Sequence, residues 1–386
     1  MRRFAGIAAI LVVFLLLPVG QASAQGARLP WGQSSDMIAW QTLAQIMAPA
    51  GNPAAHNVEF ETWASDQDIY QTSPHWPVPG TPKRLQESLF GSGHNLSGPY
   101  PLTISAGGCA PPADGPAGQF PPNACIGEEV RRNFASFQYI VSNGLYSYAG
   151  LAQAFRSKLK VDMPADAVEF KGDWVKVSDL IAWLRRSEGI TLDAAAVRKN
   201  YYVNTVSDGT KTAEYALVSF HFSTKQIKDW VWADFEHRLN PGRCDDIGCH
   251  DSFGAVDADV PSRRTANQNY GECRKTVKLL ALLSNGGIAP VWQNYCLKGS
   301  QVTFVQPDGK PTILGDSVIE RMDALTPVTQ SSCTTCHAYA AFDKNGNHGL
   351  INFVARAHPV GDVDRSQLRG YTQNDFVWGI AKMPPR

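Results

Sequence analysis

The chain has 386 residues, of which 44% are hydrophobic and 10% aromatic, and its 35 basic side chains balance 35 acidic ones. A chain of this length can build one large domain or two ordinary ones around a proper core. The zero net charge argues against a nucleic-acid binder held by a basic surface, so we expect no nucleic-acid partner. The aromatic content argues against a long disordered tail.

The N-terminus has the pattern of a secretory signal peptide. Arg2 and Arg3 precede an apolar run at positions 4–19, and Ala22-Ser23-Ala24 forms an A-x-A cleavage site. We prefer a signal peptide to a membrane anchor, because the apolar run is short for a span and the cleavage site follows it at once. We therefore expect residues 1–24 to be removed, the mature protein to be periplasmic or secreted, and no membrane insertion after cleavage.

Two periodicities mark the regular elements of the mature chain. Helical spacing of apolar residues predicts helices near residues 35–47, 127–143, 145–159, 178–189, 273–283, 316–325 and 374–381. Alternation of apolar and polar residues predicts strands near residues 58–63, 168–170, 201–206, 214–223 and 230–237. Helices together with antiparallel strands indicate the α+β fold class.

The last two strands are expected to form an antiparallel pair, because a short polar segment joins them. Alternation in the first of them places Ala216, Val218, Phe220 and Phe222 on one face, and Tyr215, Leu217, Ser219 and His221 on the other. In the second, Val231, Ala233 and Phe235 oppose Trp232, Asp234 and Glu236. His221, His237, Asp234 and Glu236 are candidates for acid or base chemistry. We prefer the simpler interpretation of a core sheet with charges paired across strands, because β propensity explains the pattern.

Six cysteines are expected to form disulfides in an exported protein. Pairing of neighbours along the sequence is the simplest arrangement, and it joins Cys109 to Cys125, Cys244 to Cys249 and Cys273 to Cys296. The segment from Cys244 to His250 also reads C-x4-C-H, a long variant of the haem attachment pattern. A second haem at Cys244, Cys249 and His250 is therefore an alternative to a small disulfide loop, and we prefer the disulfide because loop-forming residues flank the segment.

The most specific motif is C-x-x-C-H at Cys333, Cys336 and His337. Two thiols one helical turn apart can each add to a haem vinyl group, and the adjacent histidine then becomes the proximal iron ligand. The alternative is a thioredoxin-like redox site, which usually follows a strand in a βαβ unit, and no such unit precedes this motif. We therefore predict one covalently bound haem c.

The sixth iron ligand stays open at the level of sequence. Met383 lies downstream of the motif and precedes two prolines, as suits a methionine ligand in an electron-carrying cytochrome. His348 and His358 are rival ligands, and an open or water-filled position is the third alternative. Two strong axial ligands favour electron transfer, whereas an open position permits peroxide or another small molecule to bind.

Several segments together resemble a group of secreted bacterial cytochrome c family proteins, most of them uncharacterised. The resemblance is carried by residues 168–174, 215–222, 230–238 and 333–337. It implies a periplasmic haem protein with Cys333, Cys336 and His337 at the haem, and it implies no particular substrate.

These patterns divide the chain into a signal peptide at residues 1–24, an α+β body at 25–315, and a cytochrome c-like helical haem segment at 316–386 that packs on the body. The expected function is that of a periplasmic c-type cytochrome transferring electrons to a redox partner protein. The alternatives are a haem-dependent oxidoreductase or peroxidase and a haem-based ligand sensor, because the body is larger than an electron carrier needs. No catalytic residue follows from the sequence.

Overall fold

The computed structural model describes residues 29, 32–51, 58–80, 83, 86–87, 126–207, 212–240, 242–244, 247–257, 273–320, 327–349, 354–355 and 357–382. The expected signal peptide, Cys109, Cys125 and Met383 lie outside the described residues. Among the helices of the described part, none has the length and apolar character needed to cross a membrane.

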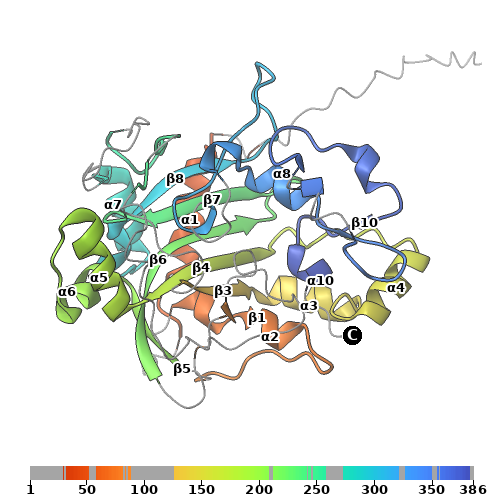
Figure 1. Cartoon of the computed structure of the whole chain (residues 1–386), viewed down its shortest axis with the longest axis horizontal. Coiled ribbons are helices and arrows are strands. Elements are labelled where there is room, and N and C mark those ends of the chain that lie inside the picture. The colour runs from red at the N-terminus through yellow and green to blue at the C-terminus, as the bar shows by residue number, and fades with distance from the viewer. Residues whose placement is uncertain are drawn as a thin grey trace, which may run out of the picture.

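An antiparallel sheet runs through the centre of the molecule (Figure 1). Its main path has the order β1-β3-β4-β6-β7-β8, while β2 pairs with β3 and β5 pairs with β6. The strands are β1 (Ala64–Ser65), β2 (Gln86–Glu87), β3 (Ile126–Arg132), β4 (Val168–Lys176), β5 (Val203–Ser207), β6 (Thr212–Thr224), β7 (Val231–His237) and β8 (Tyr295–Gln301). A separate pair joins β9 (Ala341–Phe342) to β10 (Thr372–Gln373). The pairing of β6 with β7 is antiparallel, as the sequence predicts.

Helices flank the sheet and complete the predicted α+β fold. The α-helices are α1 (Ser35–Ile46), α2 (Asp66–Ile69), α3 (Phe134–Ser142), α4 (Tyr148–Arg156), α5 (Val177–Glu188), α6 (Ala194–Asn200), α7 (Val277–Asn285), α8 (Cys333–Ala338) and α10 (Trp378–Lys382). Short 3-10 turns are η1 (Glu59–Thr62), η2 (Pro290–Asn294), η4 (Val328–Gln330) and η5 (Arg365–Leu368). Figure 1 shows α5 and α6 at one end of the sheet and α3, α4, α8 and α10 at the other.

Local side-chain chemistry explains where several of these helices begin and end. Ser34 caps α1 by accepting the amide of Met37 at 3.1 Å, and Asn133 caps α3 through the amide of Ser136. Gly189 ends α5 in the left-handed conformation, with φ +66°, which glycine adopts without steric cost. The helices predicted near residues 35–47 and 178–189 are therefore confirmed.

Two predicted elements are wrong. Within the strand expected at 58–63, residues 59–62 form η1 instead, because the Glu61 carboxylate accepts the amide of Val58 and Phe60 stacks on Phe170 across the core. The helix expected from residue 127 begins only at Phe134, and the preceding residues form β3. Strand β3 carries buried charged residues, whose ion pairs with distant residues leave no signal in hydropathy.

A bulge in β6 overturns the predicted alternation along this strand. Asp173 of β4 pairs with Ser219, whereas the next residue, Trp174, pairs with Leu217, so Val218 is an extra residue on β6. One extra residue exchanges the two faces of a strand beyond it. Tyr215, Leu217, Phe220 and Phe222 consequently share one core cluster, and Ala216 and Val218 belong to another.

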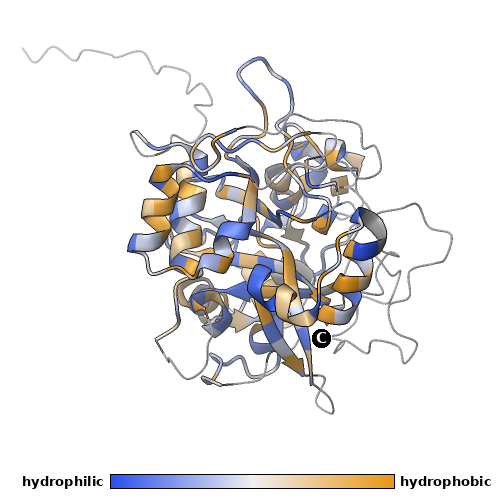
Figure 2. Ribbon diagram, turned by 90° about the vertical axis from the view of Figure 1, so that its left-hand side faces the viewer, coloured by the Kyte–Doolittle hydropathy of each residue, from blue (hydrophilic) through white to orange (hydrophobic). Residues whose placement is uncertain are grey.

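The two faces of the sheet differ in chemistry. One face packs apolar side chains against α1, α7, η1 and η2. The opposite face carries Val218 and its apolar neighbours beneath α5, and beyond them a row of buried polar residues. This row comprises Asp173 on β4, Ser219 and His221 on β6, and Asp234 and Glu236 on β7. Figure 2 shows hydrophilic and hydrophobic residues alternating along helices and strands, as such two-sided elements require.

Asp316, Ser317 and Glu320 contact this polar face. The described part of the segment from 316 onward does not confirm a cytochrome c-like helical fold. Its named elements are the short helices α8 and α10, the turns η4 and η5, and the β9–β10 pair, and further helical residues lie at 319–320, 354–355 and 357. Half of the helix expected at 316–325, residues 321–325, lies outside the described residues, and the last part of the helix expected at 374–381 forms α10.

Candidate functional site

The C-x-x-C-H motif forms helix α8. Ser332 caps the helix by accepting the amide of Thr335 at 3.3 Å, and Gln301 of β8 accepts the amide of Thr334 at 3.1 Å. These contacts fix the motif against the edge of the main sheet. Cys333 is buried and Cys336 half-buried, and both are thiols outside the two disulfides formed by the described residues.

The orientation of His337 is set by two contacts. Its Nδ1 lies 2.8 Å from the backbone carbonyl oxygen of Phe376. A carbonyl oxygen can only accept, so Nδ1 carries the proton and the lone pair resides on Nε2. The ring also packs against Trp232 of β7, with ring centroids 4.5 Å apart. Histidines that bind metals are typically oriented by a carbonyl in this way.

The donor set on α8 fits covalent haem attachment. Two thiols stand one turn apart on a helix, and the next residue is a histidine whose Nδ1–H is held by a carbonyl. Cys333, Cys336 and His337 are therefore the residues that would hold a haem c, which supplies redox chemistry at its iron.

The described residues leave the sixth iron ligand open. Met383 lies outside the described residues. His358 is exposed, and His348 lies in the turn after β9, with its Nδ1 3.1 Å from the carbonyl oxygen of Gly349. The choice among these three residues stays a prediction.

A second group of reactive side chains lies on the polar face of the sheet beside α8. His221 and Asp234 are direct cross-strand partners on β6 and β7. Glu320 lies in the segment after β8, and its Oε1 is 3.9 Å from His221 Nδ1. One ligand atom from each of His221, Asp234 and Glu320 lies within 4.8 Å of the other two. The sequence identified His221 and Asp234 as candidates, but nothing in the pattern indicated Glu320.

Burial shifts the protonation of this group. Burial, reinforced by the positive charge of Lys171 and by the neighbouring His337 ring, lowers the pKa of His221 well below that of a free imidazole. Burial and the neighbouring Asp316 raise the pKa of Glu320 to about 8 and that of Asp234 well above its usual range. Unliganded, His221 is therefore neutral and the two carboxyl groups favour the protonated form.

The same surroundings act on Cys333. Burial, followed by the nearby carboxyl groups of Glu320 and Asp234, raises the pKa of the Cys333 thiol well above its usual value. Cys333 consequently stays a protonated thiol at neutral pH instead of a nucleophilic thiolate. This environment disfavours the thioredoxin-like alternative, because that chemistry needs a thiol whose pKa is lowered.

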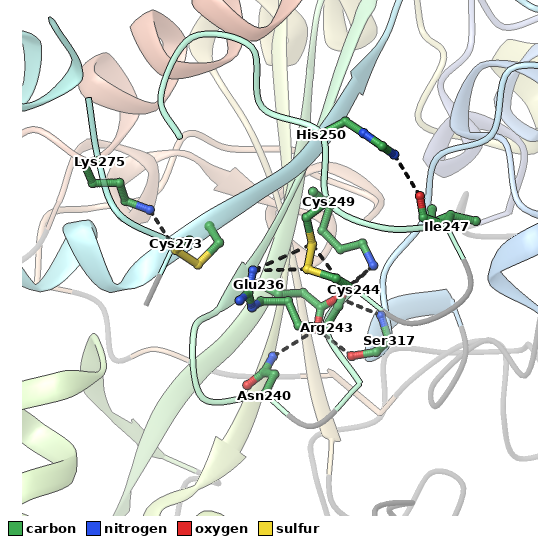
Figure 3. Close-up of a disulfide and its surroundings, with 12 residues drawn as sticks. Glu236, Asn240, Arg243, Cys244, Ile247, Cys249, His250, Cys273, Lys275 and Ser317 are labelled. Carbon is green, nitrogen blue, oxygen red and sulfur yellow. Dashed lines mark hydrogen bonds and ion pairs between the residues drawn. A yellow bond between two sulfur atoms is a disulfide. The ribbon is translucent and has the colours of Figure 1, made fainter. Parts of the chain in front are cut away.

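Glu236 and Asp316 are satisfied by hydrogen bonds and act structurally. Glu236 accepts the amide and the hydroxyl of Ser317 at 2.9 and 2.5 Å, and Lys298 Nζ lies 3.5 Å away (Figure 3). Asp316 accepts the hydroxyl of Ser219 and the amides of Val318 and Ile319. These bonds attach the segment after β8 to β6 and β7, and they position Glu320 over the sheet.

The C-x4-C-H segment forms the disulfide loop that the sequence favoured. Cys244 is bonded to Cys249, and the fully buried Arg243 lies against both sulfur atoms. Figure 3 shows the imidazole of His250 directed to the carbonyl oxygen of Ile247, 2.9 Å from Nε2. The predicted disulfide between Cys273 and Cys296 also forms. The pairing of Cys109 with Cys125 lies outside the described residues.

His237 belongs to the core and not to the site. Its ring stacks on Tyr201, and its Nε2 lies 3.0 Å from the carbonyl oxygen of Asn200. Burial lowers its pKa well below the usual value, so the ring is neutral. Of the candidate acid and base residues on these strands, only His221 and Asp234 therefore belong to the group beside α8.

Comparison with known proteins adds no relative. No protein family matches this chain, and neither the curated proteins nor the solved structures contain a match to it.

Proposed function

We propose that this protein is an exported c-type haem protein that holds one haem through Cys333 and Cys336, with His337 as the proximal iron ligand. The single observation that carries the proposal is the arrangement of α8. Its motif has the attachment spacing, its cysteines are outside the disulfides, and the Phe376 carbonyl holds His337 Nδ1. Residues 1–24 would direct export to the periplasm, where such proteins mature.

The proposed role is electron transfer to a redox partner protein. Within this role His337 anchors the iron on one side, and its hydrogen bond to Phe376 strengthens it as a ligand. Trp232 packs against the imidazole with the two rings tilted by 49°. Met383, which follows α10 in sequence, is the candidate for the opposite axial position.

A haem-dependent oxidoreductase is the second candidate, favoured by one specific observation. Buried acid and base groups, His221, Asp234 and Glu320, lie beside the haem attachment helix. An electron carrier needs no such groups, whereas an enzyme uses them to move protons to or from a bound substrate.

Intact mass measurement tests the haem proposal. The mature protein is produced with a c-type maturation system and analysed denatured but not reduced. We expect a chain that begins after Ala24 and carries one haem mass. The Cys333→Ser/Cys336→Ser variant should carry none, whereas the matched control Cys244→Ser/Cys249→Ser should keep it. Wild-type protein without covalent haem, or a double variant at Cys333 and Cys336 that retains it, would contradict the proposal.

Spectroscopy separates the two candidate functions. A carrier should give a six-coordinate low-spin spectrum in both redox states, and Met383→Ala should remove the methionine signature. A five-coordinate spectrum with peroxide turnover would favour the oxidoreductase instead.

A further inference from the structure

We infer that His221, Asp234 and Glu320 form a binding site for a divalent transition-metal ion, with zinc as the reference ion, separate from the haem attachment residues. The site lies on the buried polar face of the main sheet, where β6 and β7 meet the segment after β8. The inference goes beyond the proposed haem function and does not depend on it.

The three side chains are supplied by rigid parts of the fold. His221 and Asp234 are held opposite each other by the β6–β7 ladder. Glu320 is held through its other oxygen, since Oε2 accepts the amide of Asp316 at 2.6 Å, which leaves Oε1 3.9 Å from His221 Nδ1. Zinc lies about 2 Å from nitrogen and oxygen ligands, so its ligand atoms stand less than about 4.2 Å apart. Ligand atoms already within 4.8 Å of one another reach that spacing by small side-chain rotations.

The strongest indication is a buried carboxylate without a partner. The Asp234 side chain is fully buried, and neither of its oxygens accepts a hydrogen bond from an N–H or hydroxyl donor among the described residues; the polar group beside it is the carboxyl of Asp316. The residue paired with it on β8 is Gly299, which offers no side-chain donor. His221 Nδ1 is likewise buried without a hydrogen bond in the described structure. Buried polar atoms are nearly always satisfied, and a metal ion would satisfy both groups at once.

The charged residues near these three side chains form ion pairs or hydrogen bonds with other residues. Lys171 lies 2.8 Å from Glu128, and Lys298 is shared between Glu236 and the carbonyl oxygen of Arg243. Asp316 accepts hydrogen bonds from Ser219 and from two backbone amides. Lys171 and Lys298 thus each have a carboxylate partner outside the group of three, and two carboxylates with a neutral imidazole would balance the charge of one divalent ion.

The donor set selects the class of ion. One imidazole nitrogen and two carboxylate oxygens suit zinc and other first-row divalent ions, whereas calcium and magnesium prefer oxygen ligands alone. Three protein ligands leave a fourth position for water, which is the arrangement of catalytic rather than structural zinc sites.

The test measures zinc and iron in the same sample. Mature protein is washed with a chelator, incubated with a small excess of zinc chloride, desalted and analysed by elemental mass spectrometry. We expect one zinc per chain in the wild type and less than about a tenth as much zinc per chain in Asp234→Asn and in His221→Gln. The matched control His75→Gln replaces a histidine after α2 whose side chain is 58% exposed, and it should bind zinc as the wild type does. Far-ultraviolet circular dichroism verifies that each variant folds.

Each outcome bears on the inference. Zinc retained in Asp234→Asn would overturn it, because the ion would then sit elsewhere, for example on Cys333 and Cys336 in chains without haem. Wild-type protein that binds no zinc would overturn it as well. If Asp234→Asn does not fold, His221→Gln and Glu320→Gln decide by the same criterion. Iron content reports the haem proposal separately, so zinc without iron would contradict only the proposed function, and iron without zinc only this inference.

Discussion

Individual buried charged residues constrain how the core of this molecule packs. Lys83 is an example, since its Nζ lies 2.6 Å from both Glu61 and Glu129 and 4.2 Å from the ring centre of Trp174. Arg131 adds a second bond to Glu129 at 2.8 Å. These pairs are buried, so the loss of one partner leaves an uncompensated charge inside the protein.

Stability should consequently depend on pH through Glu129. Burial would raise the pKa of Glu129, but the charges of Lys83 and Arg131 outweigh burial and lower it. A lowered folded-state pKa means that the unfolded state binds more protons in acid. The stabilisation is therefore complete above the ordinary pKa of a glutamate and is lost as the pH falls through the folded-state value.

We expect Glu129→Gln to cost about 3 kcal/mol of unfolding free energy at neutral pH and to flatten this acid dependence. Urea denaturation between pH 7 and pH 3 measures both effects. The matched control Asp308→Asn removes an exposed carboxylate paired with Lys310 and should leave stability nearly unchanged. An equal acid dependence in Glu129→Gln and wild type would show that other carboxylates govern acid unfolding.

At the scale of elements, the two disulfides close loops of very different length. The bond from Cys273 to Cys296 spans 23 residues and ties the segment before α7 to β8, whereas the bond from Cys244 to Cys249 spans 5. Cross-links that close longer loops restrict the unfolded chain more strongly. The longer bridge should therefore contribute more to stability.

We expect Cys273→Ser/Cys296→Ser to lose about 3 kcal/mol and Cys244→Ser/Cys249→Ser about 2 kcal/mol from loop entropy alone. Urea denaturation of both double variants against the wild type makes the comparison. A larger loss for the short loop would show that the packing of Arg243 on its sulfur atoms outweighs chain entropy.

The sequence predicted those elements whose causes are local. The cap at Ser34, the stop at Gly189 and the alternation of β7 are all visible as short patterns, and each is confirmed. Strand β3 was missed because its charged residues are buried by partners far away in the chain. The predicted assignment of β6 side chains to the two faces of the sheet is wrong beyond Val218, because the alternation of apolar and polar residues does not reveal a bulge.

The residues of the candidate site also fall into two groups, those that a local sequence pattern reveals and those that only the tertiary fold brings together. The motif at Cys333, Cys336 and His337 is a local pattern and can be found by eye. The neighbours of the motif cannot be found from the sequence, because Glu320 and the carbonyl oxygen of Phe376 approach it only through the tertiary fold. The meeting of His221 with Glu320 depends on how Asp316 attaches the segment after β8 to the sheet, a contact between residues 97 positions apart.

At the scale of the whole molecule, one buried ion pair joins three distant parts of the chain. Lys225, which follows β6, lies 2.6 Å from both carboxylate oxygens of Asp375. Asp375 also accepts the amide of Met163, which precedes β4, at 2.7 Å. Asp375 and Phe376 both adopt positive φ values, +50° and +74°, which are unfavourable for residues with side chains. The ion pair therefore holds a strained turn, and the carbonyl at that turn orients His337.

We expect Asp375→Ala to lose about 3–5 kcal/mol of stability, because it leaves the buried Lys225 ammonium without its main partner and releases the strained turn. The matched control is Asp162→Ala, since Asp162 also lies 3.4 Å from Lys225 but its side chain is 59% exposed, and this change should cost less than about 1 kcal/mol. Urea denaturation measures both variants. If the haem proposal holds, Asp375→Ala should also alter the absorption spectrum at unchanged covalent haem content, because the Phe376 carbonyl no longer fixes the imidazole. Equal stability losses in the two variants would mean that Lys225 depends on both carboxylates alike and that the turn stores little strain.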